Sequence, residues 1–161
     1  LKPANILTGE FGETYVIDWG LAKVWGENDT STSSDTDHLI NTMITPVGRR
    51  YGTPLYTAPE LMRGDKFVDG RVDVFCLGNV LFEILTQKQL LHGETVKQIR
   101  QSLLENPLPK PSQVAPNRLI PPELEHICCR ALQKKVEDRF DSVQSLLAAL
   151  LDYRSKSSQA L

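Results

Sequence analysis

The most apolar run of the chain, at residues 72–85, constrains the fold more than any other feature. Its apolar side chains occupy every face of a helix: Val72, Val74, Phe75, Leu77, Val80, Leu81, Phe82, Ile84 and Leu85. A helix of this kind has to be buried on all sides. The run contains Asp73 and Glu83 and is shorter than the about 20 apolar residues that cross a bilayer. We therefore predict the central helix of a globular core, with no membrane contact from this segment.

Three further helices are predicted around this central one. Thr95 and Gln98 form a capping-box pattern at the start of an amphipathic helix. Residues 124–132 and 143–151 each repeat apolar side chains at the i, i+3, i+4 and i+7 spacing of a helix packed on one face. Asp141, with Gln144 at the third helical position, is the predicted cap of the last helix.

The N-terminal part of the chain predicts a small β-hairpin. Short apolar runs at 6–7 and 15–17 flank the turn sequence Gly9-Glu10-Phe11-Gly12. Residues 25–46 have no periodicity and gather hydroxyl and acidic side chains, which is typical of an acidic loop. The expected fold class is thus α+β, mainly helical, with a hairpin at the N-terminal end.

Proline positions mark a long connection before the last two helices. Six of the ten prolines lie within residues 106–123, which forbids a continuous helix there and predicts an extended segment over the surface. Residues 154–161 are polar, and we expect this tail to fray.

Charge and cysteine usage exclude several classes of protein. Lys and Arg number 18 and Asp and Glu 20, a formal net charge of −2, so no basic field favours nucleic acid as a partner. The cysteines lack the CxxC spacing of a zinc or redox site, and the histidines have no metal-ligand grouping: Cys76, Cys128, Cys129, His38, His92 and His126. Leu1 is not followed by a signal peptide. We expect a chain that begins within a longer protein, with reduced thiols and a cytoplasmic location.

Three short motifs in a fixed order carry the functional prediction. They are Leu1-Lys2-Pro3-Ala4-Asn5, Asp18-Trp19-Gly20 and Ala58-Pro59-Glu60. In this order they resemble the end of the catalytic loop, the DFG motif and the APE motif of a protein kinase. The resemblance implies the C-terminal lobe of the kinase fold over residues 1–153, followed by the polar tail at 154–161. Within it, the catalytic-loop end takes 1–7, the activation segment 18–60 and the helical core 61–153.

The resemblance also implies the site and its ligands. Phosphoryl transfer depends on positioning and on electrostatic stabilisation of the phosphates. Asn5 and Asp18 are the expected magnesium ligands, since amide and carboxylate oxygens suit Mg²⁺, and Lys2 is expected to hold the γ-phosphate of ATP. In relatives, the residue at Thr53 hydrogen-bonds the catalytic Asp and Lys. ATP and Mg²⁺ are the implied cofactors, and a protein carrying Ser or Thr is the implied partner.

Two features indicate the branch of the family. Lys2, two residues after the expected position of the catalytic Asp, is typical of serine/threonine kinases, and residues 52–60 resemble the loop that seats the residue after the phosphoacceptor. Trp19 replaces the usual Phe, which packs beneath the C-helix of the small lobe. This DWG variant, together with the sequence at 131–140, resembles bacterial (Hanks-type) kinases.

Several kinase parts do not occur in the sequence. It has no G-x-G-x-x-G-x-V loop, no strand Lys and no C-helix Glu. The catalytic Asp, the family's proton acceptor, is expected immediately before Leu1. We therefore expect the chain to be inactive by itself. A pseudokinase that acts as a scaffold or protein-binding module remains the alternative, and an Asp-ending triplet before Leu1 would favour the enzyme.

Three structural expectations follow from matched positions. In the family, the residue at Asp73 accepts backbone N–H bonds from the catalytic loop, so Asp73 should bind the Leu1 end. Gly78 should allow another segment to approach the central helix closely. Glu60 of the APE motif and Arg139 should form the ion pair that ties the activation segment to the core.

Autophosphorylation of the activation segment is expected in the full-length enzyme. A phosphate adds a charge of about −1.5 to −2, which Arg49 or Arg50 can pair, whereas acidic neighbours repel it from the hydroxyl cluster at 30–36. Thr42 and Thr45 are therefore the preferred sites. Mass spectrometry of the active enzyme should find phosphate on one of them, and its absence between residues 30 and 45 would refute the expectation.

Overall fold

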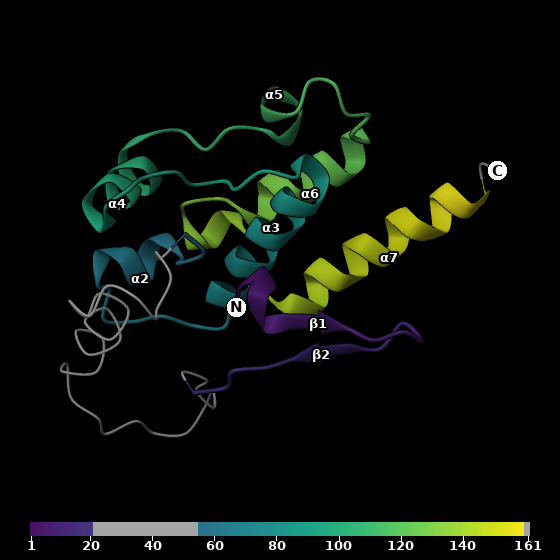
Figure 1. Cartoon of the computed structure of the whole chain (residues 1–161), viewed down its shortest axis with the longest axis horizontal. Coiled ribbons are helices and arrows are strands. Elements are labelled where there is room, and N and C mark those ends of the chain that lie inside the picture. Colours follow the sequence, from purple (N-terminus) through teal and green to yellow (C-terminus); the bar gives the residue numbers. More distant parts are fainter. Residues whose placement is uncertain (21–54, 160–161) are drawn as a thin grey trace.

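The structure is a computed structural model that describes residues 1–20 and 55–159 (Figure 1). Its elements follow in the order η1 (Pro3–Asn5), β1 (Ile6–Thr8), β2 (Thr14–Val16), α2 (Pro59–Arg63), α3 (Arg71–Thr86), α4 (Val96–Glu105), α5 (Pro111–Val114), α6 (Pro122–Ala131), η2 (Val136–Asp138) and α7 (Val143–Gln159), where η marks a 3-10 helix. The fold is therefore α+β and mainly helical, as predicted. The predicted acidic loop, Thr53 and the predicted phosphorylation sites lie outside the described residues.

The predicted N-terminal hairpin is confirmed. Strands β1 and β2 run antiparallel and pair Ile6 with Val16, Leu7 with Tyr15 and Thr8 with Thr14. Gly12 in the turn has a φ of +88°, a left-handed conformation that glycine adopts without a steric penalty.

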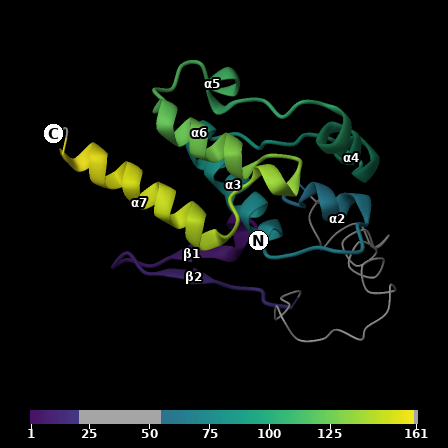
Figure 2. The ribbon, with the colours of Figure 1, turned by 180° about the vertical axis from the view of Figure 1, so that it is seen from behind.

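Helix α3 forms the centre of the helical part, in contact with α5, α6 and α7 (Figures 1 and 2). Its side chains enter two apolar clusters: Phe75 and Phe82 pack with residues of α2, α4 and α6, and Val74 packs with residues of α6 and α7. Because one helix supplies both clusters, α3 connects the packing of all the surrounding helices.

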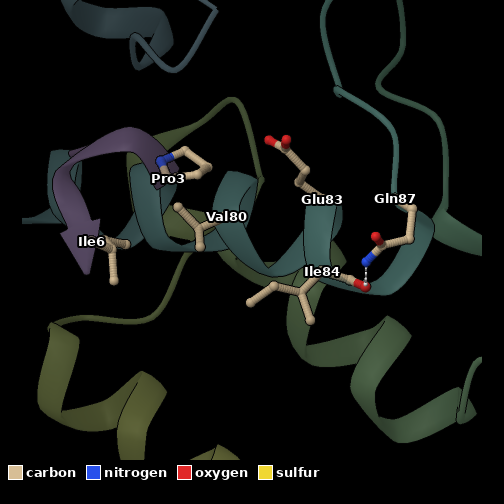
Figure 3. A pocket seen from close by; sticks show the side chains of 6 residues that line it. All are labelled: Pro3, Ile6, Val80, Glu83, Ile84 and Gln87. Atoms are coloured by element: carbon tan, nitrogen blue, oxygen red, sulfur yellow. Dashed lines mark hydrogen bonds between the residues drawn. The ribbon is translucent and has the colours of Figure 1, made fainter. Parts of the chain in front are cut away.

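The prediction that this helix is buried on all sides is wrong on one face. Ile84 is 59% exposed, and Val80 is only partly buried. Both line a groove of about 340 Å³ that Pro3 and Ile6 close on the other side (Figure 3). Helices α5, α6 and α7 pack on the remaining faces of α3, so apolar side chains directed away from them keep solvent contact.

The close approach expected at Gly78 is confirmed at the contact of α3 with α6. A Cβ atom added at Gly78 would lie 2.8 Å from Ala131 Cβ and 3.2 Å from the Ala131 carbonyl carbon. Distances this short require the helices to separate, because packed cores do not absorb added volume freely. Gly78 is therefore a packing residue that sets the distance between the two helices.

We predict that Gly78→Ala lowers the free energy of unfolding by about 1–2 kcal/mol, since overpacking outweighs the gain in helix propensity. Gly70→Ala is the matched control, because nothing lies within 4 Å of its added Cβ, and it should change stability by less than about 0.5 kcal/mol. Urea unfolding of both variants measures the difference. Equal stabilities would contradict the packing role of Gly78.

One of the predicted helix ends is confirmed and two are wrong. Thr95 and Gln98 form the predicted capping box of α4. Helix α7 is capped by Ser142, whose Oγ accepts from the Ser145 N–H at 3.1 Å, and not by Asp141. The predicted fraying tail continues the same helix to Gln159, stabilised in its last turns by an ion pair between Lys156 and Asp152.

The proline-rich connection is extended as predicted, except for one short helix. Helix α5 begins at Pro111, because proline is well suited to the first position of a helix, where no N–H is needed. Pro111 is buried and α5 contacts α3, so the connection contributes to the core as well as crossing the surface.

The prediction that Asp73 binds the Leu1 end is wrong for the described part of the chain. Asp73 lies in the first turn of α3 and is exposed, and its carboxylate makes no hydrogen bond to the other described residues. An exposed carboxylate keeps its hydration and needs no protein partner. Its negative charge is also favoured near the N-terminus of a helix.

Candidate active site

The helix η1 and the hairpin position the first two candidate residues. Pro3 begins η1, and the Asn5 N–H donates to the Lys2 carbonyl at 3.0 Å. Lys2 and Asn5 therefore lie one tight turn apart at the start of β1. The side chain of Lys2 is partly buried and makes no hydrogen bond or ion pair with the described residues.

Asp18 is brought to Asn5 at the end of β2. The Ile17 N–H donates to the Asn5 carbonyl at 2.9 Å, which continues the strand pairing by one contact. Asp18 then turns into the left-handed region with a φ of 63°, a strained conformation that in proteins concentrates at functional sites. As a result, Asn5 Nδ2 donates to Asp18 Oδ2 at 3.4 Å. The fold thus joins two of the candidate residues across the hairpin.

This amide–carboxylate pair offers the oxygen atoms expected of a magnesium site. Mg²⁺ prefers oxygen ligands and usually keeps several waters and substrate phosphates, bound by one or two protein carboxylates. Within residues 1–20 and 55–159, no group of three or more His, Cys, Asp or Glu side chains is arranged to hold a metal. That Asn5 and Asp18 bind magnesium therefore stays a prediction.

Trp19 lies on the exposed side of this site. Its indole Nε1 donates to the Val16 carbonyl at 2.8 Å, and the residue is 69% exposed. The ring therefore bends back onto the hairpin. That it packs beneath a small lobe stays a prediction.

The ion pair expected between Glu60 and Arg139 is confirmed and is fully buried. Arg139 Nη1 and Nη2 donate to the two Glu60 carboxylate oxygens at 2.7 Å each, with side chains 0% and 3% exposed. Arg139 also donates from Nε to the Gln133 carbonyl and from Nη1 to the Arg71 carbonyl. Its guanidinium lies over the ring of Phe75 at 5.0 Å. One side chain thus connects α2, α3 and the segment after α6.

A second set of contacts, which the sequence did not predict, holds residues 55–56 to α3. The Tyr56 hydroxyl donates to Glu83 Oε2 at 2.5 Å. Asn79 Nδ2 donates to the Leu55 carbonyl at 2.8 Å. The available signal was the presence of Asn79 and Glu83 in an apolar helix, because a buried polar side chain requires a hydrogen-bond partner.

Burial, reinforced by the hydrogen bond and negative charge of Glu83, raises the pKa of Tyr56 from 10.0 to about 12. The unfolded chain loses this proton first, so the contribution of Tyr56 to stability is present below about pH 10 and is lost as the pH rises to about 12. We predict that Tyr56→Phe reduces the loss of stability across this window, measured by urea unfolding at stepped pH. Tyr15→Phe, at an exposed tyrosine, is the control and should leave the slope unchanged, and a wild-type slope in Tyr56→Phe would contradict the prediction.

The cysteines contribute to packing. Cys76 and Cys128 are buried and Cys129 is partly buried, all as free thiols, and burial raises the pKa of each. A thiol with a raised pKa holds its proton and is a poor nucleophile or metal ligand. This agrees with the prediction of reduced, structural cysteines.

Among the described residues, no helix is long and apolar enough to cross a membrane. Instead, the structure has a central helix surrounded by helices, a hairpin that joins an amide to a carboxylate, and a buried ion pair after the third motif. This combination is the one expected of the class of protein kinase domains.

Comparison with known proteins supports this class. The family model described as protein kinase domain matches residues 1–150. The serine/threonine-protein kinase PknD of Chlamydia trachomatis serovar D is 34% identical over 161 residues, which cover 95% of this chain and 17% of the relative. PknD of Chlamydia pneumoniae is 36% identical over 148 residues, 91% of this chain and 16% of the relative. The chain thus belongs to the protein kinase family, and it spans about a sixth of the length of these curated relatives.

Proposed function

We propose that the chain is the larger lobe of a serine/threonine protein kinase that transfers the γ-phosphate of ATP to Ser and Thr hydroxyls of proteins. The observation that carries the proposal is the meeting of Asn5 and Asp18 at 3.4 Å, because it joins the catalytic-loop motif to the Asp18-Trp19-Gly20 motif. Relatives named as serine/threonine kinases support the choice of substrate.

Each candidate residue has a proposed role. Asn5 offers an amide oxygen and Asp18 a carboxylate to magnesium, which when bound neutralises charge on the phosphates. Lys2, one turn from Asn5, orients the γ-phosphate as a point charge. Thr53 is proposed to hydrogen-bond Lys2 and the catalytic Asp.

The chain of residues 1–161 is proposed to be inactive alone, because it contains neither a glycine-rich loop nor a strand Lys, and kinase parts act as a unit. The test is transfer of phosphate from ATP to a generic acceptor protein, measured for the chain and for the full-length protein. We expect transfer only by the full-length protein.

Two other results would overturn parts of the proposal. Robust turnover by the 1–161 chain would show that the missing motifs are not needed. No transfer by the full-length protein, together with a residue other than Asp before Leu1, would favour a pseudokinase that works as a scaffold.

A further inference from the structure

Three side chains of α3 form a stripe that contacts residues 55 and 56. Cys76 Sγ donates to the Tyr56 carbonyl at 3.3 Å, Asn79 Nδ2 donates to the Leu55 carbonyl at 2.8 Å, and Glu83 accepts from the Tyr56 hydroxyl. Their spacing of three and four residues places them on one face of the helix. Glu83 also lines the groove with Val80 and Ile84 (Figure 3). The stripe therefore borders the exposed apolar face of α3.

Within this stripe, packing does not explain why a polar residue is buried at Asn79. It is 1% exposed, and its Oδ1 is buried without a hydrogen-bond partner among the described residues. A buried polar atom without a partner is destabilising, whereas an apolar side chain of similar shape avoids that penalty. The amide is therefore poorly suited to a role in core stability, and its one hydrogen bond indicates what it does.

That hydrogen bond holds one end of the short segment at residues 55–60. The buried ion pair of Glu60 with Arg139 holds the end of the segment at α2. Asn79 holds the other end at Leu55, directly after the Thr53-Pro54 sequence. Loss of the Asn79 contact would loosen the Leu55 end, where the two contacts of Tyr56 remain, and would leave α2 in place.

We infer that Asn79 is a positioning residue for protein-substrate binding, which acts by fixing the Leu55 carbonyl. This inference rests on the proposed function and on the resemblance of residues 52–60 to the loop that seats the residue after the phosphoacceptor. Asn79 touches neither ATP nor the phosphoacceptor in this role. Its loss should weaken binding of the protein substrate and leave binding of ATP unchanged.

Amide hydrogen exchange on the 1–161 chain tests the structural step. In Asn79→Leu, exchange of the amides at 56–58 should rise about fivefold to tenfold, the equivalent of one lost hydrogen bond. Asn79→Asp keeps the shape of the side chain, but its carboxylate has no hydrogen-bond donor. It should therefore also raise exchange at 56–58, although Asp is polar and Leu is apolar. Thr86→Val is the matched control. Thr86 is 2% exposed on the same helix and hydrogen-bonds Phe82 and Lys88, so exchange at 56–58 should stay at the wild-type rate.

Steady-state kinetics of the full-length enzyme tests the functional step. In Asn79→Leu, KM for the protein substrate should rise about fivefold to tenfold, with KM for ATP and kcat within about twofold of wild type. The inference would be overturned by equal changes in all three constants or by an unchanged KM for the protein substrate. It would also be overturned if Thr86→Val raised KM for the protein substrate alone. If the wild-type enzyme transfers no phosphate, the proposed function fails and substrate positioning fails with it, while the exchange result still shows whether Asn79 fixes the segment.

Discussion

Arg139→Ala is expected to lower the free energy of unfolding by about 3–5 kcal/mol, the cost of leaving a buried charge without its partner. The Glu60 carboxylate would remain in a site where the residue is 2% exposed. The carbonyls of Gln133 and Arg71 would also lose their donor. Since a domain is stable by only about 5–15 kcal/mol, the urea midpoint should fall markedly, and residues 55–60 should become sensitive to protease.

Arg63→Ala is the control for this prediction. Arg63 pairs with Asp65 at 2.9 Å, but the two side chains are 40% and 39% exposed, and such surface pairs contribute less than about 1 kcal/mol. The double variant Glu60→Leu with Arg139→Leu should recover only part of the stability, because the two carbonyls remain unpaired. A midpoint for Arg139→Ala equal to that of Arg63→Ala would argue against a stabilising role for the buried pair.

Under the proposed function, Asp18→Asn is expected to reduce phosphate transfer by the full-length protein at least about a hundredfold, because the magnesium site loses its carboxylate ligand. The folded chain should be unaffected, since Asp18 is exposed and its side chain hydrogen-bonds only Asn5 among the described residues. The measurement is the initial rate against magnesium concentration. Partial recovery at high magnesium would identify the loss as weakened metal binding.

Asp152→Asn is the matched control for the loss of one exposed carboxylate. Asp152 pairs with Lys156 on α7, and its replacement should leave the rate within about twofold of wild type. Both variants should keep the wild-type melting temperature. A rate for Asp18→Asn similar to that of Asp152→Asn would exclude Asp18 from the metal site.

Local patterns predicted most of the elements correctly. The apolar run at 72–85 gave rise to α3, and the Thr95–Gln98 capping box begins α4. The prediction for Asp141 was wrong because Asp and Ser are both good helix caps. A shift of the helix start by one residue decides which of the two caps it. Backbone geometry in three dimensions, rather than residue type, selected Ser142.

Contacts between distant residues were predicted only where the family resemblance supplied them. Glu60 and Arg139, 79 positions apart, were paired in this way, whereas periodicity and spacing carry no information about such a contact. The polar side chain of Asn79 in an apolar helix indicated a partner but did not identify Leu55, and the exposure of Ile84 had no sequence signal. Both depend on which faces of α3 the neighbouring segments cover.

The sequence by itself determined the order of the elements, the central place of α3 and the residue types of the candidate site. These follow from interactions within a few residues, namely helix periodicity, capping and turn formation. The tertiary structure decided the left-handed turn that joins Asp18 to Asn5, the burial of the Glu60–Arg139 pair and the burial of an Asn79 oxygen that has no partner among the described residues. The physical reason is that burial and hydrogen-bond pairing depend on which segments meet in space, and that is determined only when the whole core packs together.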